Sequence, residues 1–370
     1  MKILYVTNIP TPYRRYRFDV LDKLLTKRGH TLEVLFMAET EPERQWDPIE
    51  NMEGFSARMF FNINLASGRS IGHFNPGLLW KVYRSDYDVV IVGGYASPSH
   101  FLSILLAKKN RLVLSIESNL SSMKQDNWIV NFIRKIVFNK ADAFQITGDK
   151  VKDYLNYHKV KTDKPLIFLP NIIDEIAFTN KSITPQPPTS KLVVFCAARM
   201  SEVKGILPLI NAISAENKER IVFRFAGDGP LLEQAQNLIN SKEIDAELLG
   251  NIDPEEVKNN LKNCDAFLLP SINDASPLSV IEALALSKPL LLSTRIGNIS
   301  EALIENENGF SFDIFSEESI NSALNKMYNS KVNNDLMALG KKSGLIYSSI
   351  FESNQALNNY IDCLESIFND

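Results

Sequence analysis

The chain has 370 residues, of which 45% are hydrophobic and 23% charged, so a mostly disordered chain is excluded and two domains are expected. Its net charge of −4 gives no basis for nucleic-acid binding. The charge is unevenly divided: residues 1–180 carry 24 Lys and Arg against 19 Asp and Glu, and residues 181–370 carry 16 against 25. A basic half followed by an acidic half suggests two domains with different partners.

Several protein classes are excluded by features that the sequence lacks. No apolar run approaches about 18 residues, so no transmembrane helix is predicted. Residues 1–10 read as a core strand and a loop rather than a signal peptide, which predicts a cytoplasmic location, with association at the inner face of the membrane as a further suggestion. Cys196, Cys264 and Cys363 are expected to be buried free thiols, and the four scattered histidines predict no metal site.

Short apolar runs alternate with amphipathic stretches along the whole chain. In the N-terminal half the runs occupy residues 2–8, 32–38, 88–94, 111–118, 143–148 and 165–171. In the C-terminal half they occupy residues 191–198, 221–229, 246–251, 266–271, 289–294 and 309–313. Such runs are typical of strands buried on both faces, and helical periodicity between them, as at 201–217, predicts crossover helices. The predicted fold class is α/β, with two doubly wound Rossmann-like domains of parallel strands facing across a cleft.

The segment 181–190, KSITPQPPTS, contains three prolines and no apolar periodicity, so it is predicted to be an extended linker. The N-terminal domain is therefore expected at 1–180 and the C-terminal domain at 191–350. The last segment, 351–370, has apolar residues at helical spacing and no strand after it. It is predicted to be a helix that packs back toward the N-terminal domain.

The segment 267–293 contains the clearest candidate binding site. The order Ser276–Pro277 predicts a helix that is capped by the serine and has proline at its first position. The free amides of Leu278 and Ser279, together with the helix dipole, would form an anion site that suits a diphosphate. The alternative interpretation is an ordinary capped helix without a ligand.

Two acidic residues flank this helix start. Glu282 lies one ribose length beyond it, where its carboxylate could accept hydrogen bonds from both ribose hydroxyls. Asp274 precedes it, where a transferred sugar would lie. The predicted order along the site is sugar, diphosphate, ribose. A solvated or locally paired Glu282 is the alternative.

A pair of cations follows an earlier strand of the same half. The run CAARMSEVKGI, 196–206, delivers Arg199 and Lys204 to the strand edge where the helix start is expected. Arg supplies a planar fork and Lys a compact charge, so the two would clamp a diphosphate and stabilise its charge as a leaving group without a metal. The alternative is that both are ordinary surface residues.

Two further turns complete the C-terminal half. The run FAGDGP, 225–230, suits a tight strand-to-helix turn, but the dinucleotide pattern GxGxxG is absent, which argues against a nicotinamide enzyme. In LLGNIDPEE, 248–256, the backbone of Asn251 and Ile252 is a candidate to read the edge of a nucleobase. The alternative, that this segment is simply another capped helix, stays equally open.

The order Arg-x4-Lys-Gly, GDGP, LGN, LLPS and two acids eight positions apart resembles the family 4 retaining glycosyltransferases of the GT-B fold. The resemblance is specific over 190–300 and looser over 1–180. It implies that Arg199 and Lys204 bind the donor diphosphate, Asp274 touches the donor sugar and Glu282 holds the ribose. The family usually has Glu where this chain has Asp274. The other implied donor-binding positions are Gly205, Asn251, Ile252, Ser276, Leu278 and Ser279.

The resemblance also implies the reaction. A metal-independent hexosyltransferase would move a sugar, with retention of configuration, from a nucleotide-sugar (UDP-sugar favoured) to an acceptor hydroxyl. The nucleotide-sugar is a co-substrate, so no cofactor is expected. The acceptor would be a glycan or a lipid-linked glycan in bacterial surface polysaccharide or lipopolysaccharide assembly.

The first loop departs from this family. Similar enzymes often have a Gly-Gly pair there, whereas this chain has NIPTPYRRYRF, 8–18. Its Arg14, Arg15 and Arg17 are interpreted as contacts to an anionic acceptor or to an anionic membrane surface. A solvated arginine-rich loop is the alternative.

The acceptor side shows a second departure. Similar enzymes often present a His after the strand equivalent to 111–116, close to the reacting sugar, and this chain has none there. Glu117 and His100 are the candidates to take its place. The sequence leaves two other function classes open: a GT-B-like sugar-nucleotide epimerase or phosphorylase, and a non-catalytic nucleotide-sugar-binding protein that shows no turnover.

Overall fold

The computed structural model describes residues 1–41, 54–65, 72–84, 86–108, 111–123, 128–160, 163–175 and 190–368. The chain divides into two compact units, the first formed by Met1–Ile172 with Ser353–Asp370 and the second by Ile173–Glu352. The sequence placed the first boundary at residue 180, whereas this division falls at 172–173. The predicted linker 181–190 lies outside the described residues, except for Ser190.

The first unit is built on a parallel sheet with the strand order β3-β2-β1-β6-β7-β8-β9. These strands are β1 (Lys2–Thr7), β2 (Thr31–Phe36), β3 (Ser56–Met59), β6 (Val89–Val92), β7 (Leu112–Ile116), β8 (Ala143–Ile146) and β9 (Leu166–Phe168). A separate antiparallel pair joins β4 (Ile63–Asn64) and β5 (His73–Phe74). The edge strand β3, of sequence SARM, was not predicted because it has no continuous apolar run.

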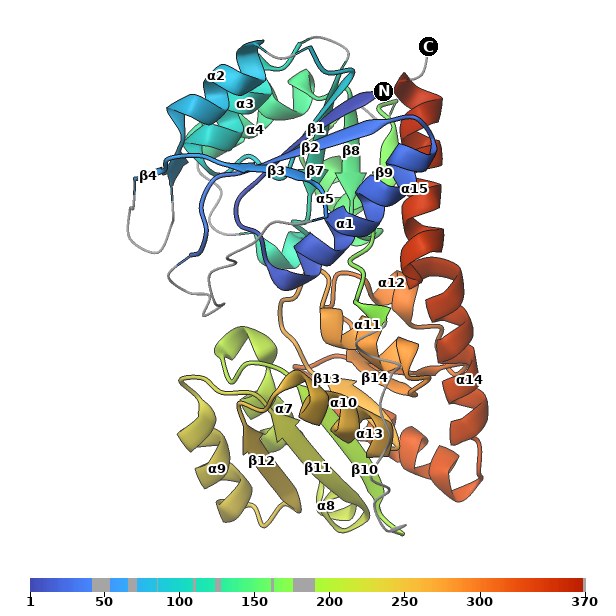
Figure 1. Cartoon of the computed structure of the whole chain (residues 1–370). Coiled ribbons are helices and arrows are strands. Elements are labelled where there is room, and N and C mark those ends of the chain that lie inside the picture. The colour runs from blue at the N-terminus through green and yellow to red at the C-terminus, as the bar shows by residue number, and fades with distance from the viewer. Residues whose placement is uncertain are drawn as a thin grey trace. The chain divides into compact units, whose positions relative to one another are not determined.

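Helices cover both faces of this sheet (Figure 1). Ile3 and Tyr5 of β1 point into a core shared with α1 (Pro12–Lys27) and α15 (Ser353–Phe368), which lie side by side. Leu4 and Val6 point into the opposite core. The helices on that side are α2 (Pro76–Arg84), α3 (Pro98–Leu106), α4 (Trp128–Lys140) and α5 (Lys150–Tyr157). Coverage on both faces explains why the strands read as continuous apolar runs.

The last helix belongs to the first unit through buried polar contacts as well as apolar ones. The hydroxyl of Tyr360 donates to Gln145 Oε1 (2.7 Å), and Gln145 Nε2 donates to the hydroxyl of Tyr5 (3.0 Å). The outer face of α15 is polar and exposes Cys363, so the expectation that all three cysteines are buried was wrong for this one. No helix in the described part of the chain is long and apolar enough to cross a membrane.

The second unit has a parallel sheet with the strand order β12-β11-β10-β13-β14-β15. The strands are β10 (Leu192–Ala197), β11 (Ile221–Ala226), β12 (Ala246–Gly250), β13 (Ala266–Leu269), β14 (Leu290–Ser293) and β15 (Gly309–Phe312). The helices are α7 (Ile206–Ala212), α8 (Ala215–Arg220), α9 (Leu232–Ser241), α10 (Pro254–Asn263), α11 (Leu278–Ala285), α12 (Ile299–Ala302), α13 (Glu317–Val332) and α14 (Leu336–Ile346). The predicted α/β class with parallel, Rossmann-like sheets is confirmed.

One predicted helix is divided. The stretch 201–217 forms a 3-10 turn (Glu202–Lys204) followed by α7 and α8. It breaks at Gly205, which adopts a left-handed conformation (φ +68°), and at Ile213, which is extended. Helical periodicity in the sequence does not reveal such backbone breaks.

Each sheet contains one point where the strand order reverses. In the first unit this point lies between β1 and β6, and in the second unit between β10 and β13. Loops leave in opposite directions there, so the carboxyl ends of the two strands border a crevice where ligands commonly bind. These two places are the candidate functional sites.

Candidate functional site

In the second unit, the loop after β10 is held against the turn after β11. The amide of Ala198 donates to Ala226 O (2.9 Å). Gly227 has a φ of +133°, and a Cβ at this position would lie 2.1 Å from Ala198 O, so the close approach requires glycine. Arg199 follows directly and is exposed. Its guanidinium has no hydrogen bond or ion pair to any residue that the structure describes.

The same loop also contacts the segment after β13. Val203 O accepts hydrogen bonds from the amides of Ile272 (2.9 Å) and Asn273 (3.1 Å). A Cβ at Gly205 would lie 2.1 Å from Pro270 O, so glycine is needed here too. The two loops that border the crevice therefore form one connected structure.

This connection brings Lys204 and Asp274 together. Lys204 Nζ donates to Asp274 Oδ2 in an ion pair whose side chains are 24% and 15% exposed. The sequence placed the cation and the acid at the same edge of the sheet, and the structure puts them in contact. Their roles toward a ligand stay predictions.

The start of α11 differs from the prediction. The residue before the helix is Pro277, in an extended conformation, and no side chain caps the helix, so the assignment of Ser276 as the cap was wrong. Leu278 and Ser279 form the first turn. Their amides donate to no acceptor within the described residues. Because a helix start concentrates positive potential, these amides can bind an anion.

Glu282 lies one turn into α11 and is half-buried. In the described part of the chain its carboxylate has no hydrogen bond or ion pair. Desolvation by burial raises its pKa from 4.5 to about 7. A desolvated carboxylate without a partner costs folding free energy, which is a common property of residues that bind a ligand.

The candidate base-reading segment lies at the start of α10. Asn251 is exposed and Ile252 is half-buried. Asp253 and Glu256 then form a reciprocal capping box, in which Asp253 Oδ1 accepts from the amide of Glu256 (2.8 Å). The capped-helix interpretation is therefore confirmed, and a contact of Asn251 and Ile252 with a base stays a prediction.

Sequence reasoning missed the loop after β14, which supports Asp274. The amide of Gly297 donates to Asp274 O (2.7 Å), and Arg295 Nε donates to Ile272 O (3.1 Å). A charged residue and a glycine directly after the apolar run 289–294 were the available signal.

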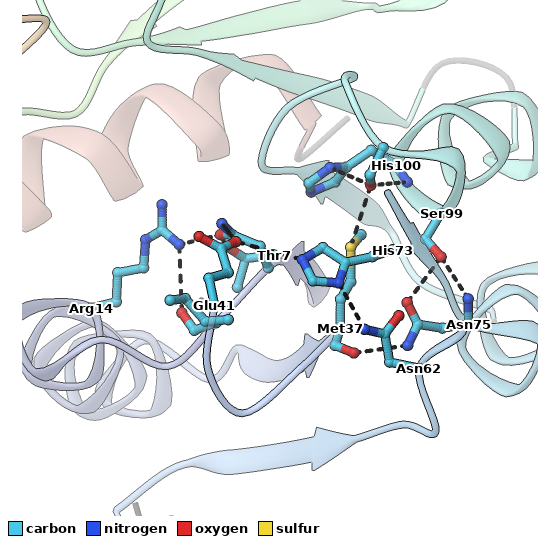
Figure 2. A network of polar contacts seen from close by, with 12 residues as sticks. Thr7, Arg14, Met37, Glu41, Asn62, His73, Asn75, Ser99 and His100 are labelled. Carbon is cyan, nitrogen blue, oxygen red and sulfur yellow. Dashed lines mark hydrogen bonds and ion pairs between the residues drawn. The ribbon is translucent and has the colours of Figure 1, made fainter. Parts of the chain in front are cut away.

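The corresponding edge of the first unit holds a network of polar side chains (Figure 2). Asn8, directly after β1, donates from Nδ2 to Glu41 Oε1 (2.7 Å) and accepts from Arg14 at Oδ1. His73 Nε2 lies 3.5 Å from the same Glu41 oxygen, and His73 Nδ1 lies 2.9 Å from Asn62 Nδ2. The sequence identified only Arg14 of these five residues.

His100 completes this edge from the start of α3. Its Nδ1 lies 3.0 Å from Ser97 Oγ, which also accepts from the His100 amide (3.3 Å). Its Nε2 is buried and has no hydrogen-bond partner in the described chain. Burial first, and then the charges of His73 and Arg14, lower the pKa of His100 to about 3, so this imidazole is neutral at ordinary pH.

The prediction of an arginine-rich loop at 8–18 was wrong. Pro12 begins α1, because proline is well suited to the first helical position. Arg14 and Arg17 are buried, the latter with its guanidinium 5.3 Å from the centre of the Phe18 ring, and Arg15 is half-buried. These arginines do not form an exposed basic surface, so they give no support to membrane contact.

Glu117 does not join the His100 network. It is exposed after β7, and no hydrogen bond or ion pair connects the two within the described residues. Of the two proposed replacements for the family's usual histidine, only His100 belongs to a built cluster of polar groups.

Comparison with known proteins supports a glycosyltransferase. The family model described as glycosyl transferases group 1 matches residues 178–343. The chain is 28% identical to the uncharacterized glycosyltransferase MJ1178 of Methanocaldococcus jannaschii. The aligned region of 231 residues covers 62% of each chain. It is 26% identical over 204 residues, 54% of each chain, to a Campylobacter jejuni α-1,4-N-acetyl-D-galactosaminyltransferase named for a diNAcBac-PP-undecaprenol-linked acceptor. The chain thus spans about half to two thirds of these relatives.

Solved structures share the fold over the whole chain. A glycosyltransferase from Rickettsia africae superposes with a TM-score of 0.74 at 16% identity, covering 100% of this chain and 99% of the other. Anabaena HepE in complex with UDP and glucose gives 0.71 at 16% identity, covering 99% and 100%. At these identities the likeness concerns the fold, which is the α/β fold of GT-B glycosyltransferases.

Proposed function

We propose that the protein is a retaining glycosyltransferase of the hexosyltransferase type. It transfers a sugar from a nucleotide-sugar, with a UDP-sugar favoured, to an acceptor hydroxyl in surface polysaccharide, lipopolysaccharide or lipid-linked glycan assembly. The family match to 178–343 supports the reaction class. The bound UDP of HepE supports the donor, and the lipid-linked acceptor in the name of the Campylobacter relative supports the acceptor class.

The observation that carries the proposal is the set of groups at the crevice between β10 and β13. Lys204 and Asp274 are in contact there, Arg199 is exposed on the same loop, and the uncapped start of α11 follows Asp274. Arg199, Lys204 and the amides of Leu278 and Ser279 would hold the diphosphate, because cations and helix amides complement phosphate oxygens. Gly205 allows the loop to approach closely, and Ser276 lies beside the helix start.

The remaining groups would define the two ends of the donor. Ionised Glu282 would accept hydrogen bonds from the ribose hydroxyls, and the donor would then supply the partners that this carboxylate lacks. Asp274 would contact the transferred sugar, where its shorter arm leaves more room than the Glu usual in the family. Asn251 and Ile252 would flank the nucleobase.

The proposed chemistry is front-face departure and attack. The bond between the anomeric carbon and the diphosphate oxygen breaks, and the acceptor oxygen bonds to the same face of that carbon. The acceptor proton moves to the departing diphosphate oxygen. Arg199 and Lys204 stabilise the charge that develops on this leaving group. Metal independence, the absence of a cofactor and the cytoplasmic location stay predictions.

A thermal-shift screen against UDP-, GDP-, ADP- and TDP-sugars tests the proposal, since a ligand that binds the folded state raises the melting temperature. We expect one nucleotide class to raise it, with UDP-sugars giving the largest shift, and free sugars to have no effect. The matching donor is then incubated with a glycan acceptor. A donor altered without any acceptor would favour an epimerase, binding without turnover a sensor, and no shift with any nucleotide-sugar would contradict the proposal.

A further inference from the structure

The outer surface of the layer α2–α3–α4 in the first unit exposes large apolar side chains. α3 packs between α2 and α4 over one face of the sheet (Figure 1). The exposed fractions are 59% for Trp80, 60% for Tyr83, 78% for Trp128, 50% for Ile129 and 59% for Phe132. These five residues are called the aromatic face below. Clusters of exposed apolar side chains are uncommon on soluble surfaces and mark contact sites.

The opposite helical layer of the same unit shows that this exposure is not a general property of the fold. α1 and α15 expose no large hydrophobic side chain along the whole of either helix. The exposed positions of α15 are occupied by polar residues such as Asn354, Gln355 and Asp362. Among the described helices of this unit, large exposed apolar side chains therefore occur on the α2–α5 side of the sheet and not on the α1–α15 side.

The excess positive charge of the N-terminal half comes from the part of the sequence that contains the helices α2, α3 and α4. Residues 76–140 carry 9 Lys and Arg against 4 Asp and Glu, whereas the rest of residues 1–180 carries 15 of each. The excess positive charge of 1–180 thus comes from segment 76–140, which contains α2, α3 and α4 together with β6 and β7.

Individual cations lie directly beside the aromatic side chains. On α4, Trp128, Phe132 and Lys135 occur at helical spacing and are all exposed, so they line one stripe. Lys135 has no ion-pair partner within the described residues. On α2, the guanidinium of Arg84 lies 4.6 Å from the centre of the Trp80 ring.

We propose that the aromatic face, with Arg84 and Lys135, docks on an anionic lipid surface. Trp and Tyr rings favour the boundary between headgroups and acyl chains, and adjacent Lys and Arg are attracted by anionic headgroups. The combination of exposed rings and excess positive charge favours a membrane over a protein partner, for which charge of one sign would not be required. This inference replaces the three arginines of α1 as the basis for membrane contact. It deepens the proposed function by placing the enzyme where a lipid-linked acceptor would be found.

Vesicle sedimentation of the full chain, without any nucleotide-sugar, tests the docking separately from the transferase reaction. We expect binding to phosphatidylcholine vesicles that contain phosphatidylglycerol, and weaker binding to phosphatidylcholine alone or at high salt. The double variant W128S/F132S should bind at least tenfold more weakly, because it loses two interfacial rings. K135E should reduce binding to the anionic vesicles by at least fivefold.

Matched controls lie on α14 of the second unit. Met337 is 83% exposed and Lys341 is exposed, so M337S and K341E make the same kinds of change away from the aromatic face. They should bind like the unmodified protein. Equal binding by all variants, or no binding to anionic vesicles, would overturn the proposal. A dimer that W128S/F132S dissociates would also overturn it, by assigning the face to a second copy of the chain.

Discussion

The two crevices where the strand order reverses have the same topology. They differ in how far their charged groups are already paired with other side chains. At the β10/β13 crevice, Arg199 is exposed, Glu282 has no partner among the residues that the structure describes, and the start of α11 has no side-chain cap. At the β1/β6 crevice, Arg14 and Glu41 are both held by Asn8, although the neutral His100 has a buried Nε2 without a partner in the described residues. An edge whose charged groups lack partners gains free energy when a ligand supplies them, whereas an edge whose charged groups are already paired gains little. The difference favours the proposed placement of the donor site in the second unit.

Protonation at the two crevices has opposite effects on folding stability. Glu282 has a pKa raised from 4.5 to about 7, so the folded state binds its proton more tightly than the unfolded state does. His100 has a pKa lowered from 6.5 to about 3, so the unfolded state binds that proton more tightly. Acidification therefore favours folding through Glu282 and opposes it through His100.

The variant K204A should have the largest effect and tests whether the second unit carries the chemistry. Removing one group that stabilises charge in the transition state typically lowers kcat by about 10²–10³. We expect a loss of this size in steady-state turnover with the donor found in the thermal-shift screen. The control K341A, on an exposed lysine of α14, should keep full activity.

Loss of the Lys204 charge also leaves Asp274 without its ion-pair partner, so stability must be followed separately. The double variant K204A/D274A removes both charges. If its melting temperature stays near that of the unmodified protein, its loss of activity does not come from unfolding. Turnover by K204A within a few-fold of the unmodified protein would contradict the proposed clamp.

The variant E282Q should separate stability from function. The ionised carboxylate costs most stability above pH 7, and this cost disappears as the pH falls toward 4.5. At about 1.4 kcal/mol per unit of pKa shift, E282Q should be more stable than the unmodified protein by up to about 3 kcal/mol at pH 8 and nearly equal to it at pH 4.5. Urea unfolding at the two pH values measures this difference.

The same variant should bind the donor more weakly, because a neutral amide has one accepting oxygen where the ionised carboxylate has two. In the unmodified protein, donor affinity should fall as the pH drops below about 7 and Glu282 becomes protonated. E282Q should lose this pH dependence. Unchanged donor affinity in E282Q would remove Glu282 from the site, whatever its effect on stability.

The comparison also explains how much the sequence could predict. The groups of the second crevice, Arg199, Lys204 and Asp274, follow directly after apolar runs, and carboxyl ends of parallel strands meet at one edge. Their proximity could therefore be predicted without knowing the strand order. What the sequence could not supply was local backbone geometry: the helix start at Leu278 without a serine cap, and the left-handed break at Gly205.

The first crevice was unpredictable for a different reason. Glu41 and His73 lie outside the strand–helix rhythm, and only the folded chain brings Glu41 into contact with Asn8 and with His73. Arg14 was assigned to a loop because two nearby prolines suggested one. The second of them, Pro12, instead begins a helix, since its missing amide hydrogen would be unpaired at that position in any case.

The variant H100N should have the smallest effect. It tests whether acidification destabilises the first crevice, as the lowered pKa of His100 predicts. Its amide can retain the contact that Nδ1 makes with Ser97 Oγ but does not titrate. In the unmodified protein, stability that depends on the neutral imidazole is complete above pH 6.5 and is lost as the pH falls toward 3. At no more than about 1.4 kcal/mol per pH unit, this loss reaches about 2 kcal/mol at pH 5.

Thermal unfolding of H100N and of the unmodified protein from pH 8 to pH 4 therefore gives a difference that changes with pH. At pH 8 the variant should be less stable, because the smaller side chain leaves a cavity in a buried site. As the pH falls, the stability deficit of H100N relative to the unmodified protein should shrink. The stability advantage of E282Q should also shrink, over the range from pH 7 to pH 4.5. A constant deficit for H100N would mean that His100 is protonated at similar pH in the folded and unfolded states. The first crevice would then be open to water, and its difference from the second would concern shape rather than charge.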